Sequence, residues 1–170
     1  MANNNLKGPI HTLIPKDDNR PRNTCLDCGY VAYENPKIIT GAVCTWENKF
    51  LMCKRAIEPR KGYWTIPAGY LELNETAADG AKREVWEEAC ASTNIVGLIG
   101  MYEIPRISQI YIVYKAEMTD SNHRPGPESE EVMLCKYEEI PWDELAFSSV
   151  RWSLEHFQNA NGPFFEVHPH

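Results

Sequence analysis

The sequence predicts a mixed α/β domain, and three observations carry this prediction. Apolar residues recur at the helical period between Ala77 and Ala91, whereas several shorter segments alternate or run apolar as strands do. The length of 170 residues suits one compact domain with a small appendage. Hydrophobic residues make up 43% of the chain, which excludes a largely disordered protein. Strands with interspersed helices indicate an α/β fold.

The start of the chain is expected to form an arm apart from the main domain. Residues 1–22 are polar and contain Pro9, Pro15 and Pro21, so we predict irregular structure there. CLDCGY follows, a CxxC with a glycine behind it, which is the usual form of a zinc knuckle. Asn35-Pro36 then marks a boundary, because a residue before proline is pushed out of the helical region. We therefore expect an arm over 1–36, a main domain over 37–157 and a C-terminal tail over 158–170.

The main domain is predicted to start with a hairpin, since a turn at Glu47-Asn48 separates two apolar segments. Thr76 and Asp79 form a capping box that begins the first helix. The predicted strands are Ile38–Trp46, Phe50–Arg55, Tyr63–Ile66, Ile95–Ile104, Ile107–Met118 and Val132–Tyr137, and the predicted helices are Ala77–Ala91 and Ser148–Phe157.

The charge balance limits the partners. The chain has 17 Lys+Arg against 24 Asp+Glu, a formal net charge of −7, so we expect no nucleic-acid binding. No apolar segment is long enough to span a membrane, and the first residues lack the pattern of a signal peptide. With cysteines that mostly lie singly in apolar segments, these features predict a reduced, cytoplasmic protein without a membrane partner. An acidic protein can still bind an anionic substrate through a metal ion.

The first predicted helix carries three carboxylates on one face. Glu84, Glu87 and Glu88 are spaced i, i+3, i+4, which brings their side chains together. Like charges at this spacing destabilise a helix, and a hard divalent cation would offset that cost. Mg²⁺ prefers carboxylate oxygens and completes its shell with water and substrate phosphates. The alternative is an ordinary solvated acidic helix face.

The segment that contains this helix follows a known sequence motif. Residues 69–91, GYLELNETAADGAKREVWEEACA, resemble the Nudix box, the 23-residue motif of Nudix hydrolases. The family pattern is glycine, five residues, Glu, seven residues, then Arg-Glu-apolar-x-Glu-Glu-x-Gly-apolar. The chain departs from it at the late glycine, which is Cys90 here, and fills the last apolar position weakly with Ala91. The resemblance extends from about Asn35 to Phe157 and implies a Nudix α/β/α sandwich with a mixed β-sheet.

The resemblance also implies a metal-dependent hydrolysis. Mg²⁺ or Mn²⁺ would be held by Glu84, Glu87, Glu88 and the backbone carbonyl of Ala68. Such an ion neutralises the oxygens of a pyrophosphate and lowers the pKa of a bound water, and Glu87 or Glu88 would take the proton. The substrate would be a small molecule, a nucleoside diphosphate linked to a second group X.

The same resemblance implies supporting roles for one arginine and for further carboxylates. Arg83 would orient the acidic cluster, or simply form a salt bridge with Glu87. Glu75 would stabilise the turn from loop to helix. Glu131, with Glu128 as the second choice, would supply a later carboxylate that acts as metal ligand or base.

The flanking segments resemble one branch of the family. CLDCGYVAYENPKIITGAV and CKRAIEPRKGYWTIPAGYLE are similar to zinc-ribbon Nudix enzymes of the NADH diphosphatase group, which include ADP-ribose and FAD pyrophosphatases. The first CxxC of those ribbons has no counterpart here, and His11 is the only other soft ligand nearby. A structural zinc needs four ligands, so Cys25 and Cys28 leave a zinc site doubtful and favour a metal-free knuckle.

The same comparison guides the choice of substrate. Ser108-Gln109-Ile110-Tyr111 replaces the Ser-Gln-Pro-Trp-type motif of NADH diphosphatases, which favours ADP-ribose or FAD and leaves NADH as an alternative. A regulator that binds a nucleotide sugar without cleaving it is a second alternative, and a ribbon that only mediates interactions is a third. Family members are commonly homodimers. The candidate substrate contacts are Tyr111 and Phe147, which could stack a base, together with Gln109, Glu72, Arg55, Arg106 and Lys54. Tyr63 and Trp64 could also stack a base but are more often core residues, and the alternative for the three basic side chains is ordinary exposure to solvent.

Overall fold

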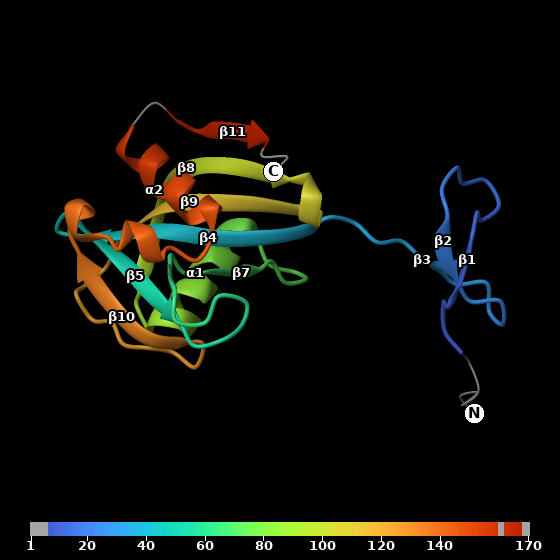
Figure 1. The fold of residues 1–170 in the computed structure, drawn as a ribbon, viewed down its shortest axis with the longest axis horizontal. Helices are drawn as coiled ribbons and strands as arrows, with labels where there is room; N and C mark the ends of the chain where they lie inside the picture. Colours follow the sequence, from blue (N-terminus) through green and yellow to red (C-terminus); the bar gives the residue numbers. More distant parts are fainter. Residues whose placement is uncertain (1–6, 160–161, 168–170) are drawn as a thin grey trace. The chain divides into compact units, whose positions relative to one another are not determined.

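The computed structural model of the chain describes residues 7–159 and 162–167. It divides into two compact units between Pro36 and Lys37. Figure 1 shows the elements of both units.

The N-terminal unit is a small antiparallel sheet of three strands in the order β1-β2-β3. The strands are β1 His11–Leu13, β2 Arg22–Thr24 and β3 Val31–Ala32. The prediction of irregular structure over 1–22 is therefore wrong for β1 and the start of β2, while residues 1–6 lie outside the described part. Strands of two or three residues are too short to show an alternating pattern, and their pairing alone defines them.

The main unit is built on a mixed sheet in the order β10-β5-β4-β9-β8-β11, with β6 paired to β5 and β7 paired to β4. β4 and β9 run parallel, whereas β8 and β9 form an antiparallel hairpin. This arrangement confirms the predicted α/β class. The elements are β4 Lys37–Trp46, β5 Lys49–Arg55, β6 Trp64–Thr65, β7 Ala68–Tyr70, α1 Ala77–Ala89, β8 Thr93–Ile104, β9 Gln109–Met118, β10 Ser129–Cys135, α2 Ser148–Gln158 and β11 Phe164–Val167.

Each face of this sheet is covered by one helix, so the unit is an α/β/α sandwich (Figure 1). The strands alternate between two cores: in β5, Met52 packs on the side of α2 and Leu51 on the side of α1. α1 contributes Val85 to its core, and α2 contributes Leu154 to the other. Neither helix of the described chain has the length and hydrophobicity needed to cross a bilayer.

The sequence missed two strands of the sheet: β7, where a tight loop was expected at Ala68-Gly69, and β11. β11 lies within the predicted tail and pairs parallel to β8, with Phe164 opposite Gly100. Four residues without polar alternation do not stand out in the sequence, and the strand depends on a partner far away in the chain. The ends of β6 and β10 also differ from the predicted bounds. Ile107 belongs to the turn Pro105–Ile107, so β9 begins at Gln109 and not at Ile107.

Helix α1 begins as the capping box predicts but ends two residues earlier. The Thr76 hydroxyl accepts the N–H of Asp79 at 3.1 Å. At the other end Cys90 adopts the left-handed conformation, with φ 48° and ψ 32°. The loop before β10 then covers the helix end, because Gly126 N–H donates to the carbonyl of Glu88 at 2.9 Å. A Cβ on Gly126 would overlap the carbonyl oxygen of Glu87, so this contact requires glycine.

We expect Cys90→Gly to stabilise the protein by about 0.5–1 kcal/mol, because glycine adopts the left-handed conformation without steric cost. Urea unfolding measures the change as a higher midpoint. Cys90→Ala is the matched control: it removes the thiol but keeps the strained backbone, and it should bring no gain. A lower midpoint for the glycine variant would contradict this interpretation.

Candidate active site

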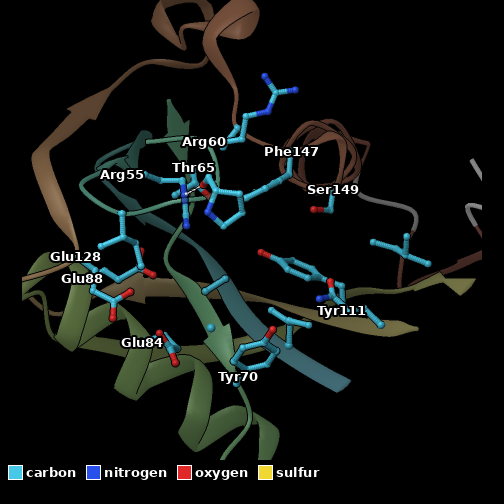
Figure 2. A pocket seen from close by; sticks show the side chains of 18 of the residues that line it. Arg55, Arg60, Thr65, Tyr70, Glu84, Glu88, Tyr111, Glu128, Phe147 and Ser149 are labelled. Atoms are coloured by element: carbon cyan, nitrogen blue, oxygen red, sulfur yellow. Dashed lines mark hydrogen bonds between the residues drawn. The ribbon is translucent and has the colours of Figure 1, made fainter. Parts of the chain in front are cut away.

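A cleft of about 850 Å³ opens in the main unit where strand β4 changes its neighbour. β4 pairs with β5 at Thr45 and Trp46, and with β7 from Ile39 to Gly41. The sheet therefore separates between β5 and β7, and the space is lined from both sides, by Thr65 and by Gly69 among others. Figure 2 shows the side chains that converge on it from α1, from the strands and from the start of α2.

Arg83 organises the acidic side of the cleft. Its guanidinium carries five N–H groups, and all five donate: two to Glu75, one each to Glu84 and Glu87, and one to the carbonyl of Tyr70. The bonds to the carboxylates are 2.6–3.1 Å long. Arg83 thus joins β7, the following loop and α1, and the predicted salt bridge with Glu87 is one part of a larger network.

Glu84 and Glu88 lie buried at the cleft, whereas Glu87 is exposed at the rim. The relative exposure is 8% for Glu84 and 6% for Glu88. Gly69 allows this arrangement, because a Cβ at that position would overlap the carboxylate of Glu84. Glycine at the start of the motif therefore makes room for a buried acidic group beside the backbone of β7.

Burial changes the proton affinity of these carboxyl groups. Desolvation, together with the neighbouring charges of Glu84 and Glu128, raises the pKa of Glu88 to about 8. Desolvation also raises the pKa of Glu84, although Arg83 opposes the shift. In contrast, hydrogen bonds from Arg83 lower the pKa of Glu75 to about 2. The two buried carboxyl groups are thus poorly stabilised as anions by the protein alone.

Of the two candidates for the later carboxylate, Glu128, the second choice from the sequence, lies at the cleft. Glu128 lines the cleft (Figure 2), and its charge acts on both Glu84 and Glu88. Glu131 does not line the cleft and is exposed on β10, opposite Lys54 of β5. Only Glu128 of these two carboxylates therefore lies beside Glu84 and Glu88, and a role for either one as ligand or base stays a prediction. The bulge in β10 between Ser129 and Glu131 shifts the register, and the sequence gives no sign of it.

Most of the other predicted contact residues reach the cleft. Arg55 lies over the ring of Phe147 at 5.2 Å and donates to the carbonyl of Pro59. Tyr111 is 7% exposed, and desolvation raises the pKa of its phenol, so it remains a donor at neutral pH. The predicted residues that line the cleft are Arg55, Ala68, Glu72, Arg83, Glu84, Glu87, Glu88, Arg106, Gln109, Tyr111 and Phe147.

Three predicted candidates lie elsewhere. Trp64 is buried in the core, as its alternative interpretation held. Tyr63 and Lys54 are not among the lining residues, and the Lys54 ammonium lies 5.7 Å from the ring of Trp64.

Sequence reasoning missed the start of α2 as part of the site. Ser148 and Ser149, at the start of that helix, line the cleft together with Trp152. One signal was present in the sequence. The N-cap residue of α2 is Phe147, whose side chain cannot accept a hydrogen bond as a Ser, Thr, Asp or Asn side chain would. A residue that departs from the local preference in this way often lies at a functional position.

The knuckle of the N-terminal unit offers only two thiols. Cys25 is buried and Cys28 is exposed, and both are free. Hydrogen bonding from the backbone and side chain of Cys28 lowers the pKa of Cys25, which is what a metal-binding knuckle provides. His11 lies on β1 opposite Thr24. Within residues 7–159 and 162–167, no three His, Cys, Asp or Glu side chains are gathered as a ready-made metal site.

Comparisons with known proteins agree with this geometry. The NUDIX domain family matches residues 36–156, and the zinc-ribbon family described as Nudix N-terminal matches residues 7–34. The crystal structure of a NUDIX hydrolase from Nitrosomonas europaea has a TM-score of 0.88 at 40% identity, covering 96% of each chain. An ADP-ribose pyrophosphatase from Methanocaldococcus jannaschii is 26% identical over 137 residues, 78% of this chain and 80% of that protein. Phosphatase NudJ from Escherichia coli K12 is 37% identical over 68 residues, 40% of this chain and 44% of that protein.

The family match spans most of the chain and contains the motif at residues 69–91 together with the cleft that the motif lines. The chain therefore belongs to the Nudix hydrolase family, and residues 7–34 form its Nudix N-terminal domain.

Proposed function

We propose that this protein hydrolyses the pyrophosphate bond of a nucleoside diphosphate linked to a second group X, using Mg²⁺ or Mn²⁺. The observation that carries the proposal is the burial of Glu84 and Glu88, one helical turn apart, at a large cleft where Gly69 makes room for the carboxylate of Glu84. Two buried acidic groups with raised pKa values are costly for the fold unless a cation joins them.

The donor set fits such a cation. The carboxylates of Glu84, Glu87 and Glu88 and the backbone of Ala68 offer only oxygen ligands, which hard divalent ions prefer. Arg83 compensates part of the negative charge, but three carboxylates around one guanidinium leave an excess. When bound, the ion would neutralise the diphosphate and lower the pKa of the attacking water.

The protein's own residues divide the remaining work. Arg83 fixes Glu84 and Glu87 in position through the bonds described above. Glu128 and Glu88 are the carboxylates placed to accept a proton at the cleft. Arg55, which has no ion pair among the described residues and whose charge acts on Glu88, is placed to contact a phosphate.

ADP-ribose or FAD is the substrate we favour. The aromatic rings of Tyr111 and Phe147 line the same cleft and can pack against a base. The relative from Methanocaldococcus jannaschii is named for ADP-ribose hydrolysis and shares most of its length with this chain. NADH remains the alternative, since the motif typical of its diphosphatases is altered at Ile110 and Tyr111. We further propose a cytoplasmic homodimer that binds neither nucleic acid nor membranes.

Replacing Glu87 and Glu88 together by Gln should lower kcat by at least about 100-fold, because ligands and base are lost. Steady-state release of AMP from ADP-ribose, FAD and NADH in Mg²⁺ measures the effect. Glu130→Gln, which alters an exposed carboxylate paired with Lys61, is the control and should retain activity. An unchanged rate in the double variant, or no turnover of any diphosphate by the wild type, would favour a binding protein without catalysis.

The two candidates for the later carboxylate can be separated by a matched pair. Glu128→Gln should reduce kcat by about 10-fold or more, since Glu128 lines the cleft and acts on Glu88. Glu131→Gln should change kcat by less than about 2-fold, in keeping with an exposed residue outside the cleft. A larger loss of kcat in Glu131→Gln than in Glu128→Gln would instead identify Glu131 as the later carboxylate.

The raised pKa of Glu88 predicts how stability depends on pH without metal. Its folded pKa of about 8 exceeds the ordinary 4.5, so the folded state binds more protons between these values and loses stability as pH rises. Relative to Glu88→Gln, the wild type in EDTA should lose at most about 1.4 kcal/mol per pH unit from pH 5 to 8. Urea unfolding at several pH values tests this, and Mg²⁺ should reverse the loss. A constant difference between the two proteins would argue against a buried, titrating Glu88.

A further inference from the structure

The start of helix α2 presents unused hydrogen-bond donors to the cleft. Its N-cap is Phe147, whose side chain cannot accept a hydrogen bond, and the N–H groups of Ser148 and Ser149 donate to no described residue. Ser and Asp are common at this position because they satisfy such groups. Both serines line the cleft, so these donors face the space where a substrate would lie.

A second observation comes from the side chain of Ser149. The residue is 5% exposed, and its hydroxyl forms no hydrogen bond with the described residues. Figure 2 shows this hydroxyl facing the cleft. Ser153, one turn later, behaves as buried serines in helices usually do: its hydroxyl donates to the carbonyl of Ser149 at 2.7 Å. Ser149 has no such carbonyl within the helix, because the residue four before it, Leu145, precedes α2, so the cleft is the side on which its hydroxyl can find a partner.

Tyr111 adds a third group of the same kind. Its side chain is almost buried on β9, its hydroxyl makes no hydrogen bond with the described residues, and the ring points into the cleft (Figure 2). Ser149 and Tyr111 approach from α2 and from the sheet, whereas Glu84 and Glu88 approach from α1. The cleft therefore has an acidic side and a side rich in donors.

The donor side has the chemistry of an anion site. Free N–H groups at a helix N-terminus and the helix dipole favour negative charge, and α2 is a helix of 11 residues. Arg106 lines the same cleft and has no ion pair among the described residues. The scissile diphosphate belongs at the acidic side with the metal ion, so these donors are left for another part of the substrate.

We propose that the amide groups of Ser148 and Ser149 and the hydroxyls of Ser149 and Tyr111 bind a second phosphoryl group, on a part of the substrate remote from the scissile bond. This inference rests on the proposed function, because it assigns the diphosphate to the other side of the cleft. It names the substrate class more closely: nucleoside diphosphate derivatives that carry an additional phosphate.

Binding of a matched pair of compounds tests the proposal without catalysis. Adenosine 3′,5′-bisphosphate and adenosine 5′-monophosphate differ by one phosphate and contain no pyrophosphate bond. By isothermal titration calorimetry in Mg²⁺, the wild type should bind the bisphosphate about 10-fold more tightly. Equal affinities, or no detectable binding of either compound, would overturn the proposal and point to a base edge or water at the start of α2.

Three variants locate the effect. Ser149→Ala should reduce the preference for the bisphosphate to about 2-fold or less, and Tyr111→Phe should reduce it in part. Ser153→Ala is the matched control, since it removes a buried hydroxyl from the same helix outside the cleft, and it should keep the full preference. Equal preferences in the Ser149 and Ser153 variants would overturn the assignment. A preserved preference in an enzyme that hydrolyses no diphosphate would instead contradict only the proposed hydrolysis.

Discussion

The guanidinium of Arg83 is the interaction on which the rest of the site depends. It uses every one of its N–H groups on β7, on the loop after it and on α1, so the strand and the helix cannot move apart without breaking several charged bonds. A lysine has three donors and no planar fork, and could not hold the same set. Because Arg83 cannot neutralise all the carboxylates around it, the same interaction that fixes the acidic cluster leaves it negatively charged. Carboxylates that are held in fixed positions and keep an excess of negative charge are what a site for a divalent cation requires.

The sheet explains why acidic and binding groups meet in one cleft. β4 has β5 as its neighbour at one end and β7 at the other, which opens the sheet and brings Ala68 and Gly69 beside α1. The helix on the opposite face, α2, reaches the same opening with its first residues. One face of the sandwich thus supplies the carboxylates and the other supplies aromatic rings and hydroxyls. Neither helix alone would form a complete site.

The sequence predicted the parts of the site that depend on local spacing, and it failed where distant segments meet. The three glutamates of α1 and the glycine before them follow from periodicity and motif, and all four residues line the cleft. Glu131 is the better positional match to the family, but the register of β10 shifts between Ser129 and Glu131, and of the two carboxylates only Glu128 lines the cleft. Ser149 was missed because a hydroxyl without a partner can be recognised only when its surroundings are known. β11 was missed for a similar reason, as its pairing with β8 joins segments about sixty residues apart.

The two edges of the sheet have a consequence for how the protein behaves at high concentration. An uncovered edge strand offers its backbone groups to any other strand, and two such edges would allow copies of the chain to associate. At one edge, β10 carries the exposed carboxylates of Glu130 and Glu131, which repel a second edge of the same kind. At the other, β11 occupies part of β8, and register shifts between Ile95 and Gly100 distort the remainder. The short C-terminal strand therefore pairs with β8 from Gly100 to Glu103, and there this edge presents the four residues of β11 in place of the longer β8.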